Sequence, residues 1–422
     1  MNQSGAKATE VTRVGRKLTD AHDSQIARVV AMVDALPSRG VADKLIAPLR
    51  PRLAQLRPDR PLQFERLLFL PLDLLIVAPQ DWSPGSPTVP RTLLAPVGEV
   101  VRVVLGDLAR EIEAEILGRT TADRTIIDRV GARLWPAAAQ VIAAADDTPG
   151  AWSKYGISRA LQRTVTLPMA AVLDQATAIQ ALVVSAERGE PVGGPALLTI
   201  LDRGARHGAD AWGMMLALML CRLPRADEAL RVIAIKGISA ATRVAAEEAI
   251  DAVLNGIERE GGEGGTLDTA ALSDAGAELT RIVGLLDGLD AEGSGIAVLT
   301  GNDRGERHNR IASIRRRLDA TCRSRFEAGL AGELIAPMLS LPPDAGSAEI
   351  LKLEGTAREL RRLEMCGRRL GSQDSYSRML QATAVEIRGI RGNGALTLAD
   401  RVRMVEILAG PDEALAMLAA GG

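Results

Sequence analysis

The sequence predicts an all-α protein, a multi-helix array that is solenoid-like or made of irregular helical bundles in two to three subdomains. Three observations support this prediction. Apolar residues form 47% of the chain but aromatic residues only 2%, and a core of Leu, Ala, Val, Ile and Met suits helix packing better than sheets. Apolar residues also recur at helical spacing along most of the chain. Finally, 422 residues exceed what one compact core usually organises.

The composition also bears on location and partners. The 51 basic and 53 acidic residues nearly cancel, so no overall field attracts the protein to nucleic acid or to an anionic membrane. Cys221, Cys322 and Cys366 form no C-x-x-C pair, which favours a reducing interior. No secretory signal is visible at the N-terminus, and the longest apolar runs, 67–78 and 213–221, are too short to span a bilayer. We therefore expect a cytoplasmic protein without a membrane span, and its Arg-rich, Lys-poor composition is typical of a GC-rich bacterial genome.

The N-terminal part contains the most unusual segment of the chain. Residues 1–20 are polar and are expected to form a disordered arm, and residues 21–148 are predicted to form a helical domain. Within it, the apolar run LLFLPLDLLIVA leads into PQDWSPGSPTVPR. Because proline removes donors and fixes φ, this Pro-rich loop, 79–96, should be ordered but irregular. It surrounds Trp82, which either presents a docking surface or plugs the core of a rigid crossover.

Two long helices are predicted after this loop. The first extends from Pro96 to Gly118, and the second covers about 123–144, with a kink at Pro136. One face of the first helix carries a single apolar stripe, consisting of Val97, Val101, Val104, Leu108 and Ile112. The DDTPG stretch that ends at Gly150 marks the first predicted domain boundary.

Residues 149–258 are predicted to form a central array of short helices. Gly and Pro residues separate successive amphipathic segments, which is typical of α-solenoids, although no fixed sequence period is present. The last of these helices, 240–258, carries Glu247, Glu248 and Asp251 largely on the face opposite its apolar residues.

Acidic residues are concentrated in the next part of the chain. Residues 227–292 contain 14 acidic and five basic side chains. Residues 259–303 are predicted to be an interruption rich in Gly and acidic residues, with one helix at about 269–286 and a short strand-like run at 296–300.

The C-terminal helical domain, 304–422, is predicted to begin with a long helix at about 307–341. Thr397 and Asp400 form a capping-box signature for its last helix. The long helix is strongly basic at its start, where eight arginines from Arg304 to Arg325 stand against three acidic residues, Asp303, Glu306 and Asp319. Its inward seam is predicted to consist of Ile311, Ile314, Leu318 and Cys322.

The distribution of these arginines separates two interpretations. A nucleic-acid footprint should align basic residues along one face, but at about 100° per residue they scatter around the helix. We therefore expect them to pair with carboxylates of the acidic stretch 227–292, within the protein or between subunits. Solvated charge without a function is the third interpretation.

The sequence contains no motif for catalysis or for metal binding. His22, His207 and His308 are the three histidines, and none has a second ligand at metal spacing. The P-loop pattern G-x-x-x-x-G-K-[ST] and the nucleophile elbow G-x-S-x-G are also missing. We expect no metal and no cofactor, and a protein without enzymatic activity is favoured over an enzyme.

The first functional hypothesis is a non-catalytic scaffold or adaptor that binds a protein partner, or another copy of itself, through a helical groove. The first alternative is a nucleic-acid-associated regulator that uses the basic helix 304–325, and the second is an enzyme with a site between helices. The candidate partner-binding residues are Trp82, Arg304, Arg307, Arg310, Arg315, Arg316 and Arg317.

Overall fold

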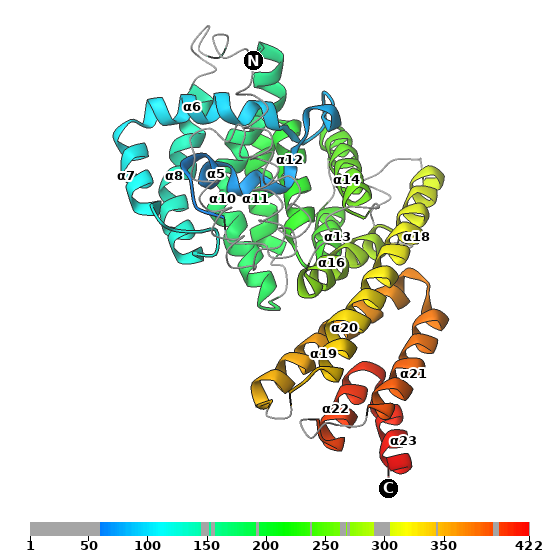
Figure 1. Ribbon diagram of the computed structural model, residues 1–422. Helices are drawn as coiled ribbons and strands as arrows, with labels where there is room; N and C mark the ends of the chain where they lie inside the picture. Colours follow the sequence, from blue (N-terminus) through cyan, green and yellow to red (C-terminus); the bar gives the residue numbers. More distant parts are fainter. Residues whose placement is uncertain are drawn as a thin grey trace, which may run out of the picture. The chain divides into compact units, whose positions relative to one another are not determined.

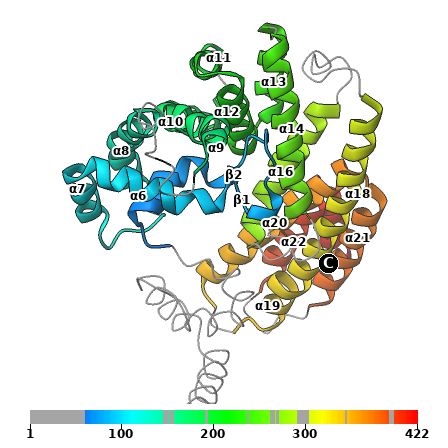
Figure 2. The same ribbon diagram turned by 90° about the horizontal axis from the view of Figure 1, so that it is seen from above.

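The computed structural model describes residues 60–144, 152, 157–190, 194–236, 239–261, 267, 271–290, 304–342, 345–390 and 396–421. They divide into two compact units, the first up to Leu254 and the second from Asn255 onward. Both units consist almost entirely of helices (Figures 1 and 2), which confirms the all-α prediction. The predicted arm 1–20 and the run 296–300 lie outside the described residues.

Helix α10 (Leu167–Glu187) is the centre of the first unit. It packs against α8 (Arg124–Ala144) and α12 (Ala209–Arg222), and its Val172 and Leu173 are fully buried. The other elements of this unit are α5 (Phe64–Phe69), η2 (Leu70–Leu75), β1 (Ile76–Val77), η3 (Pro79–Asp81), β2 (Val89–Pro90), η4 (Arg91–Leu93), α6 (Leu94–Leu105), α7 (Asp107–Ile116), α9 (Arg159–Leu161), η6 (Gln162–Thr166), α11 (Gly194–Arg206), α13 (Ala226–Lys236) and α14 (Ala240–Glu260). The division between the units falls within α14, and the boundary predicted at Gly150 lies inside the first unit.

The long helix predicted from Pro96 to Gly118 is wrong, because the chain forms two helices, α6 and α7, in this region. Gly106, between them, has φ of +49°, a conformation that glycine adopts far more easily than other residues. The chain turns sharply at this point (Figure 1). Val104, predicted to lie in the core stripe, is therefore 62% exposed, whereas Ile112 of α7 is buried.

The stretch Arg159–Glu187, which contains α10, is long and apolar enough to cross a membrane by length and composition alone. However, 61% of its most apolar part is buried within the structure, and the core helix of a globular unit has the same features. The expectation of no membrane span was based on the shorter runs 67–78 and 213–221 and did not consider this stretch.

Helix α20 (Ser347–Leu370) is the centre of the second unit. It packs against α16 (Leu272–Asp290), α18 (Arg304–Gly329) and α22 (Leu398–Ala409). The other helices are η7 (Leu330–Ile335), α19 (Ala336–Leu339), α21 (Gln373–Gly389) and α23 (Pro411–Gly421). Because α18, η7 and α19 follow one another without a break, together they correspond to the long helix predicted at 307–341.

Two local predictions for the second unit are confirmed. All four residues of the predicted seam of α18 are at most 1% exposed, namely Ile311, Ile314, Leu318 and Cys322. At the start of α22, Thr397 Oγ1 accepts a hydrogen bond from Asp400 N at 3.2 Å, and Asp400 Oδ2 accepts one from Thr397 N at 2.9 Å. This reciprocal capping satisfies two backbone donors at the helix end.

Candidate functional site

The arginines of α18 are largely held by carboxylates of the same unit. Arg310 Nε lies 3.1 Å from Glu258 Oε1, and Arg317 Nη2 lies 3.3 Å from the same oxygen. Arg315 Nη2 lies 2.6 Å from Asp287 Oδ1. Both carboxylates belong to the acidic stretch 227–292, so the structure shows the contact between basic and acidic segments within a single chain.

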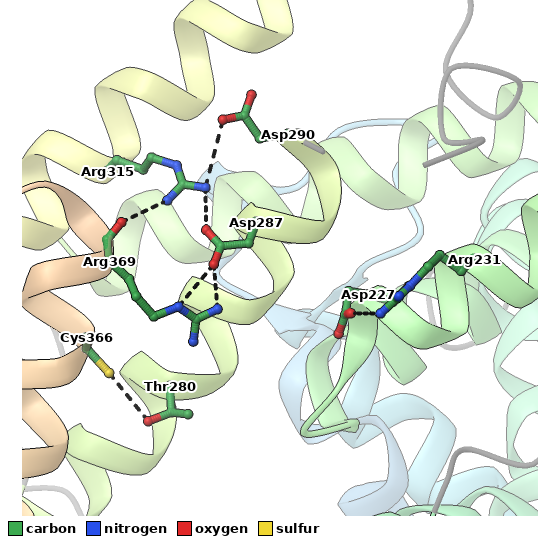
Figure 3. A network of polar contacts seen from close by, with 8 residues as sticks. All are labelled: Asp227, Arg231, Thr280, Asp287, Asp290, Arg315, Cys366 and Arg369. Carbon is green, nitrogen blue, oxygen red and sulfur yellow. Dashed lines mark hydrogen bonds and ion pairs between the residues drawn. The ribbon is translucent and has the colours of Figure 1, made fainter. Parts of the chain in front are cut away.

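Asp287 lies between two arginines from different helices (Figure 3). Its Oδ1 accepts from Arg315 of α18 at 2.6 Å, and its Oδ2 accepts from Arg369 Nε of α20 at 3.1 Å. Arg315 is only 16% exposed, and its Nη2 is also 3.9 Å from Asp290 Oδ2. Asp290 in turn lies 2.8 Å from His308 Nδ1. This network therefore joins α16, α18 and α20, and it accounts for the position of Arg315 without an external partner.

The remaining candidate arginines differ in exposure. Arg316 is exposed and Arg307 is half-buried. The side chain of Arg304, at the first position of α18, lies outside the described side chains. The structure thus brings Arg310, Arg315 and Arg317 to internal carboxylates instead of placing them together on an open face.

Two thiols of the second unit are buried and held in the protonated form. Burial raises the pKa of Cys322 to about 12. Burial also raises the pKa of Cys366, whose Sγ lies 3.4 Å from Thr280 Oγ1 (Figure 3). Because the thiolate is the nucleophile, both pKa shifts disfavour nucleophilic reaction of these sulfurs at neutral pH.

The segment 78–88 of the first unit, called here the Trp82 loop, is closed at its two ends. The short strands β1 and β2 that flank it pair in parallel, with Ile76 opposite Val89. Inside the loop, Trp82 Nε1 donates a hydrogen bond to Thr88 O at 3.2 Å. The segment therefore forms an Ω-loop, a compact surface loop with adjacent ends, and such loops are frequently functional.

The tip of the Trp82 loop is a tight turn. Ser86 N donates to Ser83 O at 3.1 Å, Pro84 occupies the second position, and Gly85 in the third has φ of +86°. This arrangement is characteristic of a type II turn, in which proline sets the first φ and glycine supplies the positive one. The backbone conformation of the tip is therefore determined by the residues of the turn itself.

Trp82 lies in this loop with part of its side chain accessible. It is half-buried, whereas Trp135, Trp152 and Trp212 are 3%, 1% and 4% exposed. The exposed residues around it are Pro79, Gln80, Asp81, Ser83, Pro84 and Gly85. Trp82 thus contributes only part of its surface to the core, and the rest lies among exposed loop residues.

A carboxylate of α14 lies close to the tip of the Trp82 loop. A Cβ atom on Gly85 would be 3.6 Å from Glu248 Oε1 of α14. Burial raises the pKa of Glu248, and the charges of Asp210 on α12 and of Glu247 raise it further. The loop therefore lies beside an acidic group that belongs to the same unit.

Sequence reasoning did not connect these carboxylates with the loop. It placed Glu247 and Glu248 on the outward face of their helix, but the position of Glu248 beside Gly85 depends on how α14 packs. Gly213 in the apolar helix α12 gives one signal, because a Cβ there would be 3.1 Å from Ala245 O of α14. A glycine inside an apolar helix commonly marks such a close approach between helices.

We expect Glu248→Gln to increase the free energy of unfolding of the first unit at pH 7 by about 0.2–0.5 kcal/mol, the size of a like-charge pair on a helix. Folding raises the pKa of Glu248, so the folded state increasingly disfavours the charged carboxylate as pH rises above the pKa of the unfolded chain. The advantage of the variant should disappear below about pH 4, where glutamate is protonated in both states.

Urea unfolding followed by tryptophan fluorescence at both pH values measures this effect, because all four tryptophans lie before Leu254. Asp128→Asn, at an exposed carboxylate of α8, serves as the control and should leave the midpoint unchanged. Equal midpoints for wild type and Glu248→Gln at pH 7 would contradict the prediction.

No family model matches the chain, and neither does any curated protein or solved structure with which it was compared. Among the described residues, no group of three or more His, Cys, Asp or Glu side chains is placed to hold a metal ion.

Proposed function

We propose that the protein is a non-catalytic helical scaffold or adaptor, and that the Trp82 loop is the place where it binds a protein partner. The observation that carries this proposal is the half-buried Trp82 in a loop closed by its own hydrogen bonds. Tryptophan is among the residues that contribute most binding energy at protein interfaces. A loop that is already ordered also loses little conformational freedom when a partner binds.

The basic helix α18 gives less support to a nucleic-acid function. Arg310, Arg315 and Arg317 are within ion-pair distance of Glu258 or Asp287. Arginines that are neutralised in this way contribute less to the attraction of phosphate groups, which supplies most of the non-specific affinity for nucleic acids. We therefore favour the protein-binding function.

We expect Trp82→Ala to weaken partner binding by about 2 kcal/mol, or roughly 30-fold in Kd, because truncation of a tryptophan hot spot has at least this cost. A photo-crosslinking residue, benzoylphenylalanine, at exposed Gln80 tests this prediction in the native cell. It should form a discrete adduct with one protein in the wild-type background, and that adduct should be lost when Trp82→Ala is added.

The same crosslinker in place of exposed Asp128, on α8, is the control and should not give this adduct. Circular dichroism and the fluorescence of the three buried tryptophans establish that the variant still folds. An adduct that survives Trp82→Ala unchanged, or that is absent at Gln80, would show that the loop is not the docking site.

A further inference from the structure

The charge around the Trp82 loop indicates which class of protein partner it fits, and this inference rests on the proposed function. The tip of the loop meets α14 at Glu248, where a Cβ on Gly85 would lie 3.6 Å from Oε1. Asp210 and Glu247 are close enough to Glu248 to raise its pKa by repulsion. Asp210 is exposed and the two glutamates are half-exposed, so all three can face a bound partner.

Within the described part of the chain, Asp210, Glu247 and Glu248 form no ion pair with a basic side chain, unlike the carboxylates that hold the arginines of α18. Burial and the charges of Asp210 and Glu247 all raise the pKa of Glu248. The basic side chains nearest in sequence are Arg206 and His207 before Asp210 and Arg243 before Glu247, and all three are exposed. Like charges held together beside the tip of a loop that carries a half-buried tryptophan are characteristic of sites that bind an opposite charge.

We propose that the Trp82 loop docks a basic segment of the protein partner, with an arginine or lysine against the Trp82 ring and neighbouring positive charges neutralised by Asp210, Glu247 and Glu248. Tryptophan is the aromatic side chain with the strongest attraction for cations. The indole N–H already donates to Thr88 O, so the ring is the part of Trp82 available for recognition. The same carboxylates repel phosphate, which disfavours nucleic acid at this surface.

Two peptides of equal length and shape test this proposal, an end-blocked tetra-arginine and an end-blocked tetra-citrulline that lacks the charge. Fluorescence is the readout, since Trp135, Trp152 and Trp212 are buried and the Trp82 component is obtained by subtracting the spectrum of Trp82→Phe. Tetra-arginine should change the Trp82 emission saturably and less strongly as salt is added. Tetra-citrulline should leave it unchanged, and equal effects of the two peptides would overturn the proposal.

A double variant distinguishes the effect of the carboxylates beside the loop on peptide binding from the effect of the net charge of the protein. Asp210→Asn with Glu248→Gln should raise the Kd for tetra-arginine roughly three- to tenfold, given the strength of exposed ion pairs. The matched control, Glu99→Gln with Asp128→Asn, removes the same charge from exposed positions on α6 and α8. It should change the Kd less than about twofold, and equal losses in both double variants would contradict recognition by the acidic group.

Collisional quenching gives an independent measurement in the absence of any peptide. When each ion is compared with its quenching of free N-acetyltryptophanamide, caesium should quench Trp82 relatively more than iodide, because carboxylates concentrate cations around the ring. The Asp210→Asn, Glu248→Gln variant should reduce this difference. A larger normalised quenching of the wild type by iodide than by caesium would show that the loop is not in a negative potential and would overturn the proposal.

The crosslink from Gln80 separates failure of this inference from failure of the proposed function. If a Trp82-dependent adduct forms, but tetra-arginine does not bind and the crosslinked segment is not basic, the class of partner is wrong and the loop stays the docking site. If no adduct forms, the proposed function and this inference both fail.

Discussion

Trp135→Ala is expected to lower the free energy of unfolding of the first unit by about 3–5 kcal/mol, as large-to-small substitutions of buried tryptophan do. Trp135 of α8 is 3% exposed, and its Nε1 donates to Leu67 O of α5 at 3.0 Å. Because α8 packs against α5, α6 and α10, the substitution would leave a cavity at the junction of these helices. Trp152 and Trp212 are also buried and remain as fluorescence reporters for urea unfolding.

Two further variants identify the origin of this loss. Trp135→Phe removes the hydrogen bond but keeps most of the ring volume, and Leu67 O still accepts from the backbone N–H of Leu70. Its cost should be about 1–2 kcal/mol. Trp82→Ala removes a half-buried ring and should cost about 1 kcal/mol. A similar loss for Trp135→Ala and Trp82→Ala would contradict the buried position of Trp135.

Features that depend on local periodicity or local hydrogen bonds were predictable from the sequence. The buried seam of α18 follows from apolar residues at helical spacing, and Ile311 and Cys322 at its ends are at most 1% exposed. The capping box of Thr397 and Asp400 joins residues three positions apart. In both cases the interacting groups are fixed by one helix, so the packing of other elements hardly affects them.

Features that depend on packing between distant segments were not predictable. Apolar residues at helical spacing continue from Val97 to Ile112 on both sides of Gly106. Because glycine is tolerated within helices, this pattern predicted one helix and gave no sign of the turn between α6 and α7. The candidate site shows the same limitation. Its Pro-rich loop and Trp82 stand out by composition, but the approach of Glu248 to Gly85 arises from tertiary packing, which the pattern of one helix does not encode.

The charge pattern of the chain also acquires its meaning from packing. In the second unit, Glu258 and Asp287 of the acidic stretch lie against arginines of α18. In the first unit, Glu247 and Glu248 of the same stretch lie beside Asp210. Glu258 and Asp287 are thus neutralised within the chain, whereas Glu248 is repelled by Asp210 and is the carboxylate that a basic partner would stabilise.

Gly367→Ala is expected to destabilise the second unit by about 1–3 kcal/mol, the usual cost of overpacking a core. A Cβ on Gly367 of α20 would lie 2.1 Å from Cε2 and 2.4 Å from the hydroxyl oxygen of Tyr376. The Tyr376 ring is fully buried and packs edge-on against Phe326, with centroids 5.2 Å apart and planes at 76°. Because Phe326 is also fully buried, the ring has no open side toward which it could move.

The same substitution elsewhere on α20 should have the opposite sign, which makes Gly355→Ala the matched control. A Cβ on Gly355 would have no neighbour within 4 Å, so alanine there should stabilise the unit by about 0.5–1 kcal/mol through its lower conformational entropy. Thermal unfolding measures both values, and hydrogen exchange in peptides from 347–389 assigns the Gly367→Ala effect to α20 and α21. In a Tyr376→Ala background, the cost of Gly367→Ala should largely disappear, because the double-mutant cycle removes the clash itself. A cost that persists there, or a stabilising Gly367→Ala in the wild type, would contradict the close contact between Gly367 and Tyr376.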